Sequence, residues 1–340
     1  MDSPSKMNIA VIGAGAIGSL VAGYLKRNGE TASLIGRPHA VEAIEKQGLH
    51  ISGVRGDVTV TINASERLRE KPDLAILAVK TQDLEQALRA NEAFLKDSCV
   101  LTTQNGIQAD YIVAKYLPRE HIVSSIVMFG ATHLEPAEVV HNFEGNWVIG
   151  KFFCSNDSAV NELRDVLNTI FPTLISDNIG GMKYLKIFLN ANNCIPAILG
   201  TSMQEAFRDL TISRISIAIW KEGLDIVKQS GVALASLPDF PLERLTGLAA
   251  MPMDEAAKIF SGIMSSLSKE PLYGSILQSI KRGRPSEIDY INGEFVNLAR
   301  KHNLKAPLNE ELVEMVHQVE KNNTFFRKER LLAEAEKFIT

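Results

Sequence analysis

The sequence predicts an α/β fold, in which a doubly wound parallel sheet is followed by an all-α C-terminal domain. In the first half, short apolar runs alternate with helical patterns, which is typical of strands and helices in such a sheet. A glycine-rich turn directly follows the first apolar run. From Met182 onward the periodicity is mostly helical, so we place two domains at residues 1–179 and 180–340.

The first element of the chain carries the strongest functional signal. Residues 8–12 are an apolar run typical of a buried strand, and a Gly-x-Gly-x-x-Gly turn and a helical pattern follow it. Gly13 permits the tight turn, Gly15 lets a pyrophosphate approach the backbone, and Gly18 lets the helix pack on the strand. The order strand, glycines, helix predicts a Rossmann-type dinucleotide-binding domain. The cofactor-binding residues predicted in this turn are Gly13, Gly15, Ala16, Ile17 and Gly18.

The end of the second strand indicates which dinucleotide is bound. Residues 31–35 form this strand, and NAD-binding chains place an Asp or Glu at its carboxyl end, for the ribose 2′-hydroxyl. This chain has Gly36-Arg37 there. An arginine suits a 2′-phosphate because it combines positive charge with a planar fork of donors. We therefore predict NADPH as the cofactor; the alternative is that Arg37 is a solvated loop residue.

Further apolar runs predict the other strands of the first domain. Ligands of open α/β sheets sit at the carboxyl ends of the strands, and Lys80 and Asn105 each follow a strand-like run. This placement makes both of them candidates for a ligand site. The alternatives are a solvated lysine and a turn asparagine. The runs are residues 74–79, 99–103, 122–128, 138–142 and 146–150, and a helix and strand at 158–170 and 173–176 complete the sheet.

Composition excludes several classes of protein. The 340 residues are 45% hydrophobic and 22% charged, which is ordinary for a globular chain. A net charge of −4 gives no reason to expect a nucleic acid or an anionic membrane as partner. No apolar run approaches the length of a membrane span, and residues 1–6 lack a signal-peptide pattern, so we expect a cytoplasmic protein. The three widely spaced cysteines predict reduced thiols, with neither disulfides nor a metal site.

A polar stripe marks the first helix of the second domain. Lys186, Asn190 and Asn193 are spaced i, i+4 and i+7, which places them on one helix face. Polar groups on an otherwise apolar helix are costly to bury unless something polar meets them, and the oxygens of a substrate would do so. Lys183 is a competitor that lacks an Asn one turn later. The alternative is a solvated lysine beside structural amides.

A second polar stretch of the helical domain begins at Ser275. Pro285 suits the first turn of a helix, which would place Glu287 near the positive end of that helix. A helix-starting carboxylate without a functional role is the alternative for Glu287. Residues 308–340 predict one terminal amphipathic helix, which would either form a homodimer contact or cap the domain.

Taken in order, these motifs resemble the ketopantoate reductase (2-dehydropantoate 2-reductase) family over residues 7–320. The resemblance rests on the glycine turn, Lys80, Asn105-Gly106, Lys186-x-x-x-Asn190 and the string Glu-Ile-Asp-Tyr-Ile-Asn-Gly at 287–293. It implies a Rossmann domain, a helical domain and a site in the cleft between them. It also implies NADPH-dependent reduction of 2-dehydropantoate to pantoate, in pantothenate and coenzyme A biosynthesis.

The resemblance assigns a role to each matching residue. Lys186 would be the general acid, and Glu287 would orient substrate and cofactor. Ser275 would bind the substrate carboxylate. The active-site amides would be Asn105 and Asn190, of which Asn105 would act both in catalysis and at the cofactor. Arg37 and Lys80 would contact NADPH.

Two other functions stay open at this stage. The family usually has a Trp where Tyr184 stands, and its pattern also differs at Cys194 and Leu272. These differences surround the substrate, so a related NADP-dependent 2-oxoacid reductase or hydroxyacid dehydrogenase is one alternative. A non-catalytic NADP(H) sensor is the other, although a sensor would need neither Lys186 nor Glu287.

Overall fold

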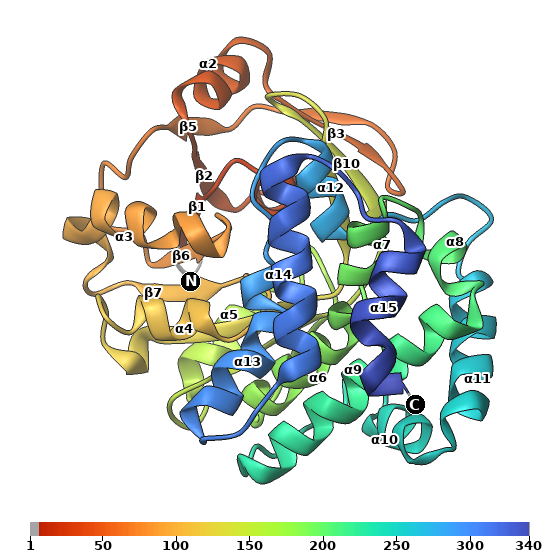
Figure 1. Ribbon diagram of the computed structural model, residues 1–340. Helices are drawn as coiled ribbons and strands as arrows, with labels where there is room; N and C mark the ends of the chain where they lie inside the picture. Colours follow the sequence, from red (N-terminus) through yellow and green to blue (C-terminus); the bar gives the residue numbers. More distant parts are fainter. Residues whose placement is uncertain (1–6, 340) are drawn as a thin grey trace. The chain divides into compact units, whose positions relative to one another are not determined.

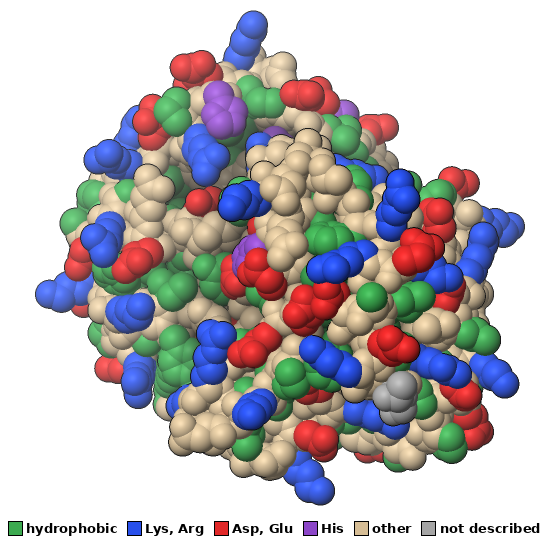
Figure 2. All heavy atoms as spheres, in the orientation of Figure 1, with side chains coloured by type: hydrophobic (Ala, Val, Ile, Leu, Met, Phe, Trp, Pro, Cys, Tyr) green, Lys and Arg blue, Asp and Glu red, His purple; other side chains and the backbone are tan. Residues whose placement is uncertain are grey.

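The computed structural model describes residues 7–339, in two compact units that comprise Met1–Gly180 and Gly181–Thr340 (Figure 1). Residues 1–6, where we predict no signal peptide, lie outside the described residues. Within residues 7–339, no helix combines the length and the apolar character that crossing a membrane requires. Basic and acidic side chains are interspersed over the face shown in Figure 2, in keeping with the small net charge.

The first unit is built on an eight-stranded sheet in the order β12-β11-β8-β7-β6-β1-β2-β5. Neighbouring strands are parallel except β11 and β8. The chain runs from β1 out to β2 and β5, then returns to the other side of β1 for β6, so the strand order reverses between β1 and β6. This confirms the predicted doubly wound, Rossmann-type sheet. The strands are β1 (Asn8–Ile12), β2 (Thr31–Ile35), β5 (Asn63–Ser65), β6 (Leu74–Leu77), β7 (Cys99–Thr102), β8 (Ile122–Val127), β11 (Trp147–Lys151) and β12 (Thr173–Ile175).

Helices cover both faces of this sheet. Side chains alternate along a strand, so Ile9 and Val11 of β1 belong to one core and Ala10 and Ile12 to the other. The first core is closed by α1 (Ala16–Arg27) and α5 (Ser158–Leu167), and the second by α3 (Thr81–Leu95) and α4 (Gln108–Val113). The short helices α2 (Pro38–Gln47) and η1 (Arg119–His121) lie in the connections.

A second sheet, which the sequence pattern did not predict, packs on α1. It has the order β4-β3-β10-β9, and the predicted strand at 138–142 lies within it. A Cβ at Gly23 would lie 2.4 Å from Ile51 Cδ1, and Tyr24 Oη lies 2.9 Å from His141 Nδ1. Helix α1 is therefore enclosed by both sheets. The strands are β3 (Leu49–Gly53), β4 (Val58–Val60), β9 (Gly130–His133) and β10 (Glu138–Phe143).

The second unit is mostly helical, as predicted. Its longest helix, α9, contributes Trp220, whose ring meets Phe260 of α11 edge to face at 5.3 Å. The helices are α6 (Ile179–Ala191), α7 (Cys194–Leu199), α8 (Met203–Phe207), α9 (Leu210–Gln229), α10 (Leu242–Ala250), α11 (Met253–Ser265), α12 (Ser275–Lys281), η2 (Ile288–Tyr290), α13 (Asn292–Lys301), α14 (Pro307–Asn322) and α15 (Lys328–Ile339).

Three predicted helix boundaries in this unit are wrong. The terminal segment is two helices, because Asn323 adopts a left-handed conformation (φ 48°) that ends α14. Helix α6 ends at Ala191, so Asn193 lies beyond it, directly before α7, and does not share one helix face with Lys186. Glu287 precedes the 3₁₀ helix η2 and not the first turn of an α-helix, since α13 begins only at Asn292.

Candidate active site

The β1–α1 turn has the shape of a phosphate-binding loop. Gly13 has a φ of +124°, and a Cβ there would lie 2.6 Å from the backbone of Ala78. A Cβ at Gly18 would lie 1.9 Å from the carbonyl oxygen of Gly13. At Gly15 no atom lies within 4 Å of the corresponding position. Gly13 and Gly18 are thus required for packing, whereas Gly15 leaves open space beside the N-terminus of α1, where Ala16 begins the helix.

The loop after β2 lies directly beside this turn. The backbone N–H of Gly13 donates to the carbonyl of Ile35 at 2.8 Å, and a Cβ at Gly36 would lie 2.7 Å from Ala14 Cβ. Arg37 follows and begins helix α2, with its side chain largely exposed and its Nη2 3.4 Å from Asp83 Oδ2. Arg37, with its exposed guanidinium, therefore comes directly after the residue that contacts the β1–α1 turn.

The loops after β6 and β7 meet at the same edge of the sheet. Gln104 Nε2 donates to the carbonyls of Leu77 and Val79, at 2.9 and 2.8 Å, and so joins the ends of the two strands. Lys80 follows Val79 and precedes α3, and Asn105 follows Gln104 as a half-buried residue. The carboxyl ends of β1, β2, β6 and β7 therefore converge, as the sequence predicts.

In the second unit, Lys186 and Glu287 lie close enough for their charges to interact. Lys186 is half-buried on α6. Its pKa is lowered from 10.5 to about 8: burial is the main cause, the charge of Lys183 acts in the same direction, and the carboxylate of Glu287 opposes the shift. Asn190 lies one turn after Lys186 on the same helix. A lysine of this kind is protonated near neutral pH but releases its proton more readily than an exposed one.

The residues predicted to bind substrate lie at two neighbouring helix ends of this unit. The backbone N–H of Asn193 donates to the carbonyl of Asn190 at 2.9 Å. A Cβ at Gly274 would lie 3.0 Å from Asn193 Cγ, so the start of α12 packs against Asn193. Ser275 is the first residue of α12 and is exposed. Asn190, Asn193 and Ser275 are thus brought into one neighbourhood.

Three polar residues near these sites were not predicted as functional. Lys183 is only 2% exposed, although the only role considered for it was that of a competitor to Lys186. Asn192 is 3% exposed, and neither polar atom of its side chain has a hydrogen-bond partner among residues 7–339. Asp110 is fully buried below the end of β7, where it accepts bonds from Thr102 and Ser124. Only the i, i+3 spacing of Lys183 and Lys186 is a signal visible in the sequence.

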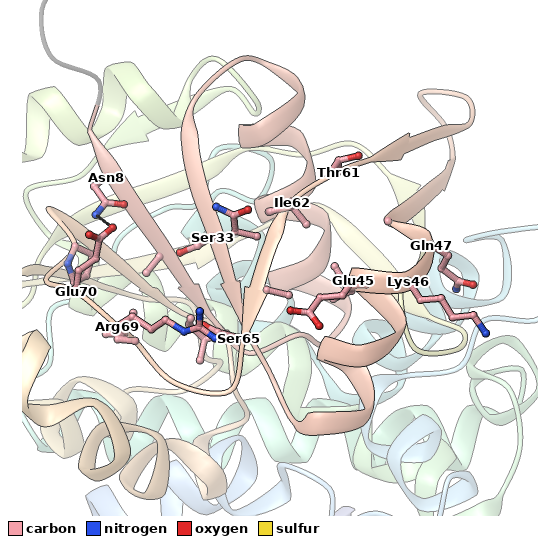
Figure 3. Close-up of a pocket in the computed structure, with 18 residues that line it drawn as sticks. Asn8, Ser33, Glu45, Lys46, Gln47, Thr61, Ile62, Ser65, Arg69 and Glu70 are labelled. Atoms are coloured by element: carbon pink, nitrogen blue, oxygen red, sulfur yellow. Dashed lines mark hydrogen bonds between the residues drawn. The ribbon is translucent and has the colours of Figure 1, made fainter.

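The cavity of about 820 Å³ drawn in Figure 3 lies elsewhere. It runs along β1, β2 and β5, between Ser65 and the amino end of β1 at Asn8, where Asn8 Nδ2 donates to Glu70 Oε1 at 3.1 Å. None of the predicted site residues lines it. In the described part of the chain, no three His, Cys, Asp or Glu residues cluster as metal ligands would.

The fold and the site define a class of protein. A Rossmann-type unit with a phosphate-binding turn, followed by a helical unit that carries a lysine of lowered pKa, is the architecture of a nicotinamide-dependent oxidoreductase. Comparison with protein families narrows this class. Residues 9–153 match the family "Ketopantoate reductase PanE/ApbA", and residues 178–320 match its C-terminal domain. The chain belongs to the ketopantoate reductase family, whose members are oxidoreductases that act on a ketone group.

Individual relatives agree with this assignment. The chain is 33% identical to 2-dehydropantoate 2-reductase of Pyrococcus horikoshii over 305 residues, which cover 89% of this chain and 94% of that protein. It is 32% identical to the protein of the same name from Pyrococcus abyssi, over 89% and 94% of the two chains. A solved PanE/ApbA family ketopantoate reductase from Ralstonia eutropha JMP134 is 26% identical, with a TM-score of 0.79 over 93% of this chain and 99% of that one.

One structural neighbour has a different name. D-mandelate dehydrogenase, solved with NADH and anilino(oxo)acetate, is 26% identical to this chain, with a TM-score of 0.79 over 94% of this chain and 100% of that one. The same architecture therefore accommodates more than one oxidoreductase, and one of these was solved with NADH.

Proposed function

We propose that this protein reduces 2-dehydropantoate to pantoate with NADPH. The observation that carries the proposal is the pairing of Lys186, with its pKa of about 8, and Glu287 in one unit of a ketopantoate reductase fold. The names of its relatives, 2-dehydropantoate 2-reductases that match about nine-tenths of the chain, support this substrate. A branched 2-oxoacid with a hydroxyl offers Glu287 a group to recognise.

The proposed cofactor site comprises the residues at the carboxyl edge of the first unit. Gly15 leaves room for a pyrophosphate, and the first N–H groups of α1, at Ala16 and Ile17, would donate to it. Arg37 would bind the 2′-phosphate, which favours NADPH over the NADH named for D-mandelate dehydrogenase. Lys80 and Asn105, which follow β6 and β7, would contact the remainder of the cofactor.

The proposed mechanism assigns proton transfer to Lys186. Bound NADPH would supply the hydride that adds to the carbonyl carbon. Negative charge then develops on the ketone oxygen, and Lys186 stabilises that charge and donates its proton to the oxygen. Since its pKa is about 8, Lys186 is protonated near neutral pH and yields its proton at a modest cost.

The other predicted residues orient the substrate. Ser275, exposed at the start of α12, would bind the substrate carboxylate, and Glu287 the substrate hydroxyl. The amides of Asn190 and Asn193 would hold the lysine and the ketone in line, so that less orientational freedom is lost in the reaction.

The decisive experiment is an assay of NADPH oxidation with 2-dehydropantoate and a panel of simple 2-oxoacids. We expect selective turnover of 2-dehydropantoate, and a higher kcat/KM with NADPH than with NADH. Lys186→Met should lower kcat by about 10²–10⁴, the range for loss of a general acid, while NADPH binding is retained. If only another oxoacid is reduced, the protein is the second candidate, a related 2-oxoacid reductase. The similarity to D-mandelate dehydrogenase supports this candidate. Binding of NADPH without any turnover would indicate a sensor.

Two coarser features complete the proposal. Cys99, Cys154 and Cys194 are all free thiols, which favours the reducing cytoplasm as the compartment of this enzyme.

We propose a homodimer as one role for the terminal helices α14 and α15, to be tested by light scattering.

A further inference from the structure

The short segment that carries Glu287 is held by helix α14 on both sides of that residue. Before Glu287, the backbone N–H of Ser286 donates to Glu320 Oε1 at 2.7 Å. After it, Asp289 Oδ1 lies 3.0 Å from His317 Nε2. His317 and Glu320 are three residues apart on α14, so they project from the same face of that helix. The position of Glu287 therefore depends on two side chains that lie outside its own segment.

The far end of the segment has a separate and more rigid anchor. Asn292 Nδ2 donates to Asn309 Oδ1 at 3.0 Å, and both residues are fully buried. Glu222 Oε1 in turn accepts from Asn309 Nδ2 at 2.8 Å. Buried amides have no water to exchange for these bonds, so the start of α13 stays fixed. His317 and Glu320 therefore hold the other end of the segment, on the two sides of Glu287.

His317 lies between two carboxylates. Its Nε2 faces Asp289 and its Nδ1 lies 3.1 Å from Glu320 Oε2. An ionised carboxylate only accepts hydrogen bonds, so both contacts are satisfied only when both ring nitrogens carry a proton. Burial lowers the pKa of His317, but the bonds to Glu320 and Asp289 outweigh that effect and raise the pKa above its ordinary value of 6.5. Those two carboxylates are the charged groups that face the imidazole.

We propose that His317 and Glu320 are positioning residues for Glu287, and that the protonated imidazole of His317 holds the segment of residues 286–289 against α14. This inference rests on the proposed role of Glu287 in recognising the substrate. When His317 loses its proton, one of its nitrogens can no longer donate, and one carboxylate loses its partner. The segment then loosens, the KM for the oxoacid rises, and kcat, which depends on Lys186, is retained.

Kinetics of three proteins across pH test the proposal. For the natural protein, KM should rise as the pH increases through the raised pKa of His317. His317→Gln removes the charge, so its KM should be about five- to twentyfold higher at low pH and nearly independent of pH. His317→Arg keeps both a charge and two donors, so its KM should stay low at high pH. In each case kcat should stay within about twofold of the natural value.

A second histidine supplies the matched control. His50 Nε2 lies 3.7 Å from Asp57 Oδ1 in the first unit, and its side chain is 42% exposed, against 39% for His317. His50→Gln therefore makes the same chemical change at a similar histidine–aspartate pair. Its KM should match that of the natural protein. The proposal is overturned if His317→Gln has the natural KM at every pH, or if both variants change alike.

Amide hydrogen exchange provides a readout that needs no turnover. In the full chain without substrate, peptides covering residues 284–292 should exchange about tenfold faster in His317→Gln and Glu320→Gln than in His50→Gln. If 2-dehydropantoate is not reduced, the proposed function fails, yet exchange still decides whether this helix holds the segment. Equal exchange in all three variants would contradict the inference.

Discussion

At the scale of single residues, the proposed chemistry depends on the pKa of Lys186. An exposed lysine, with a pKa near 10.5, would release its proton too reluctantly for efficient acid catalysis near neutral pH. Burial of Lys186 brings its pKa to about 8, with Lys183 acting in the same direction and Glu287 against it. Desolvation is therefore the main cause of the lowered pKa, and the charges of Lys183 and Glu287 change that pKa in opposite directions. Substitution of either neighbour should move the pKa of Lys186 in a known direction.

Lys183→Met provides the residue-scale prediction. The Lys183 ammonium repels the charged form of Lys186 and lowers its pKa, so its removal raises that pKa. In the natural protein, kcat for ketone reduction should fall above about pH 8, by about tenfold per pH unit, as the proton is lost. In Lys183→Met this fall should begin at higher pH. The measurement is a pH–rate profile with both substrates saturating.

The control for this prediction is a lysine of the same unit that does not act on Lys186. Lys221 on α9 donates to the carbonyl of Met251 at 3.4 Å. Lys221→Met removes an equal charge and should leave the profile unchanged. A profile for Lys183→Met that declines at the natural pH or below it would show that the charge of Lys183 does not set the pKa of Lys186.

At the scale of elements, different glycines of the β1–α1 turn serve packing and cofactor binding in the proposed site. Alanine normally stabilises a helix by about 1 kcal/mol relative to glycine. At Gly18 the added Cβ would lie 1.9 Å from the Gly13 carbonyl, so Gly18→Ala should instead destabilise the fold, by about 1–3 kcal/mol. At Gly15 the space is open, so Gly15→Ala should change the free energy of unfolding by less than about 0.5 kcal/mol.

Gly15→Ala should weaken cofactor binding although it leaves the stability of the fold unchanged. The methyl group of Gly15→Ala occupies the space proposed for the pyrophosphate, so NADPH should bind at least about tenfold more weakly to a fully folded protein. Urea unfolding without cofactor and fluorescence titration with NADPH measure the two effects separately. A folded Gly15→Ala variant with natural affinity would exclude the turn as the pyrophosphate site.

A helix or strand could be predicted from the sequence where its own residues show its pattern, and not where it depends on a distant segment. The strands β1, β2, β6 and β7 could be predicted from their own sequences, because buried parallel strands have near-continuous apolar sequences. The second sheet was missed because β3 is partly polar and its partner β10 lies far along the chain. The break at Asn323 was missed since its left-handed conformation has no pattern of its own.

The candidate site divides in the same way. The positions of Lys80 and Asn105 after β6 and β7 could be predicted because a strand's carboxyl end is visible in the sequence. The burial of Lys183 and the two carboxylates around His317 could not, because each depends on side chains from other segments. Motifs thus identify candidate ligand-binding residues, whereas the residues packed around those candidates emerge only from the tertiary structure.

At the scale of the whole molecule, the two units carry different parts of the proposed site. The first contains the phosphate-binding turn, and the second contains Lys186 and Glu287. We propose that they are separate cofactor-binding and catalytic domains. The chain has two tryptophans, and one lies in each unit: Trp147 donates to Ser125 Oγ at 2.9 Å, and Trp220 to the carbonyl of Phe188 at 2.8 Å.

These tryptophans allow each unit to be followed on its own. Trp220→Phe leaves Trp147 to report on the first unit, and Trp147→Phe leaves Trp220 to report on the second. A ligand that binds only the folded state stabilises it by about 2.7 kcal/mol at a hundred times its Kd. Because the phosphate-binding turn lies in the first unit, NADPH should raise the urea midpoint reported by Trp147 more than the one reported by Trp220. Equal shifts would mean that the units unfold together or that both hold the cofactor, and the division into two separate domains would then be wrong.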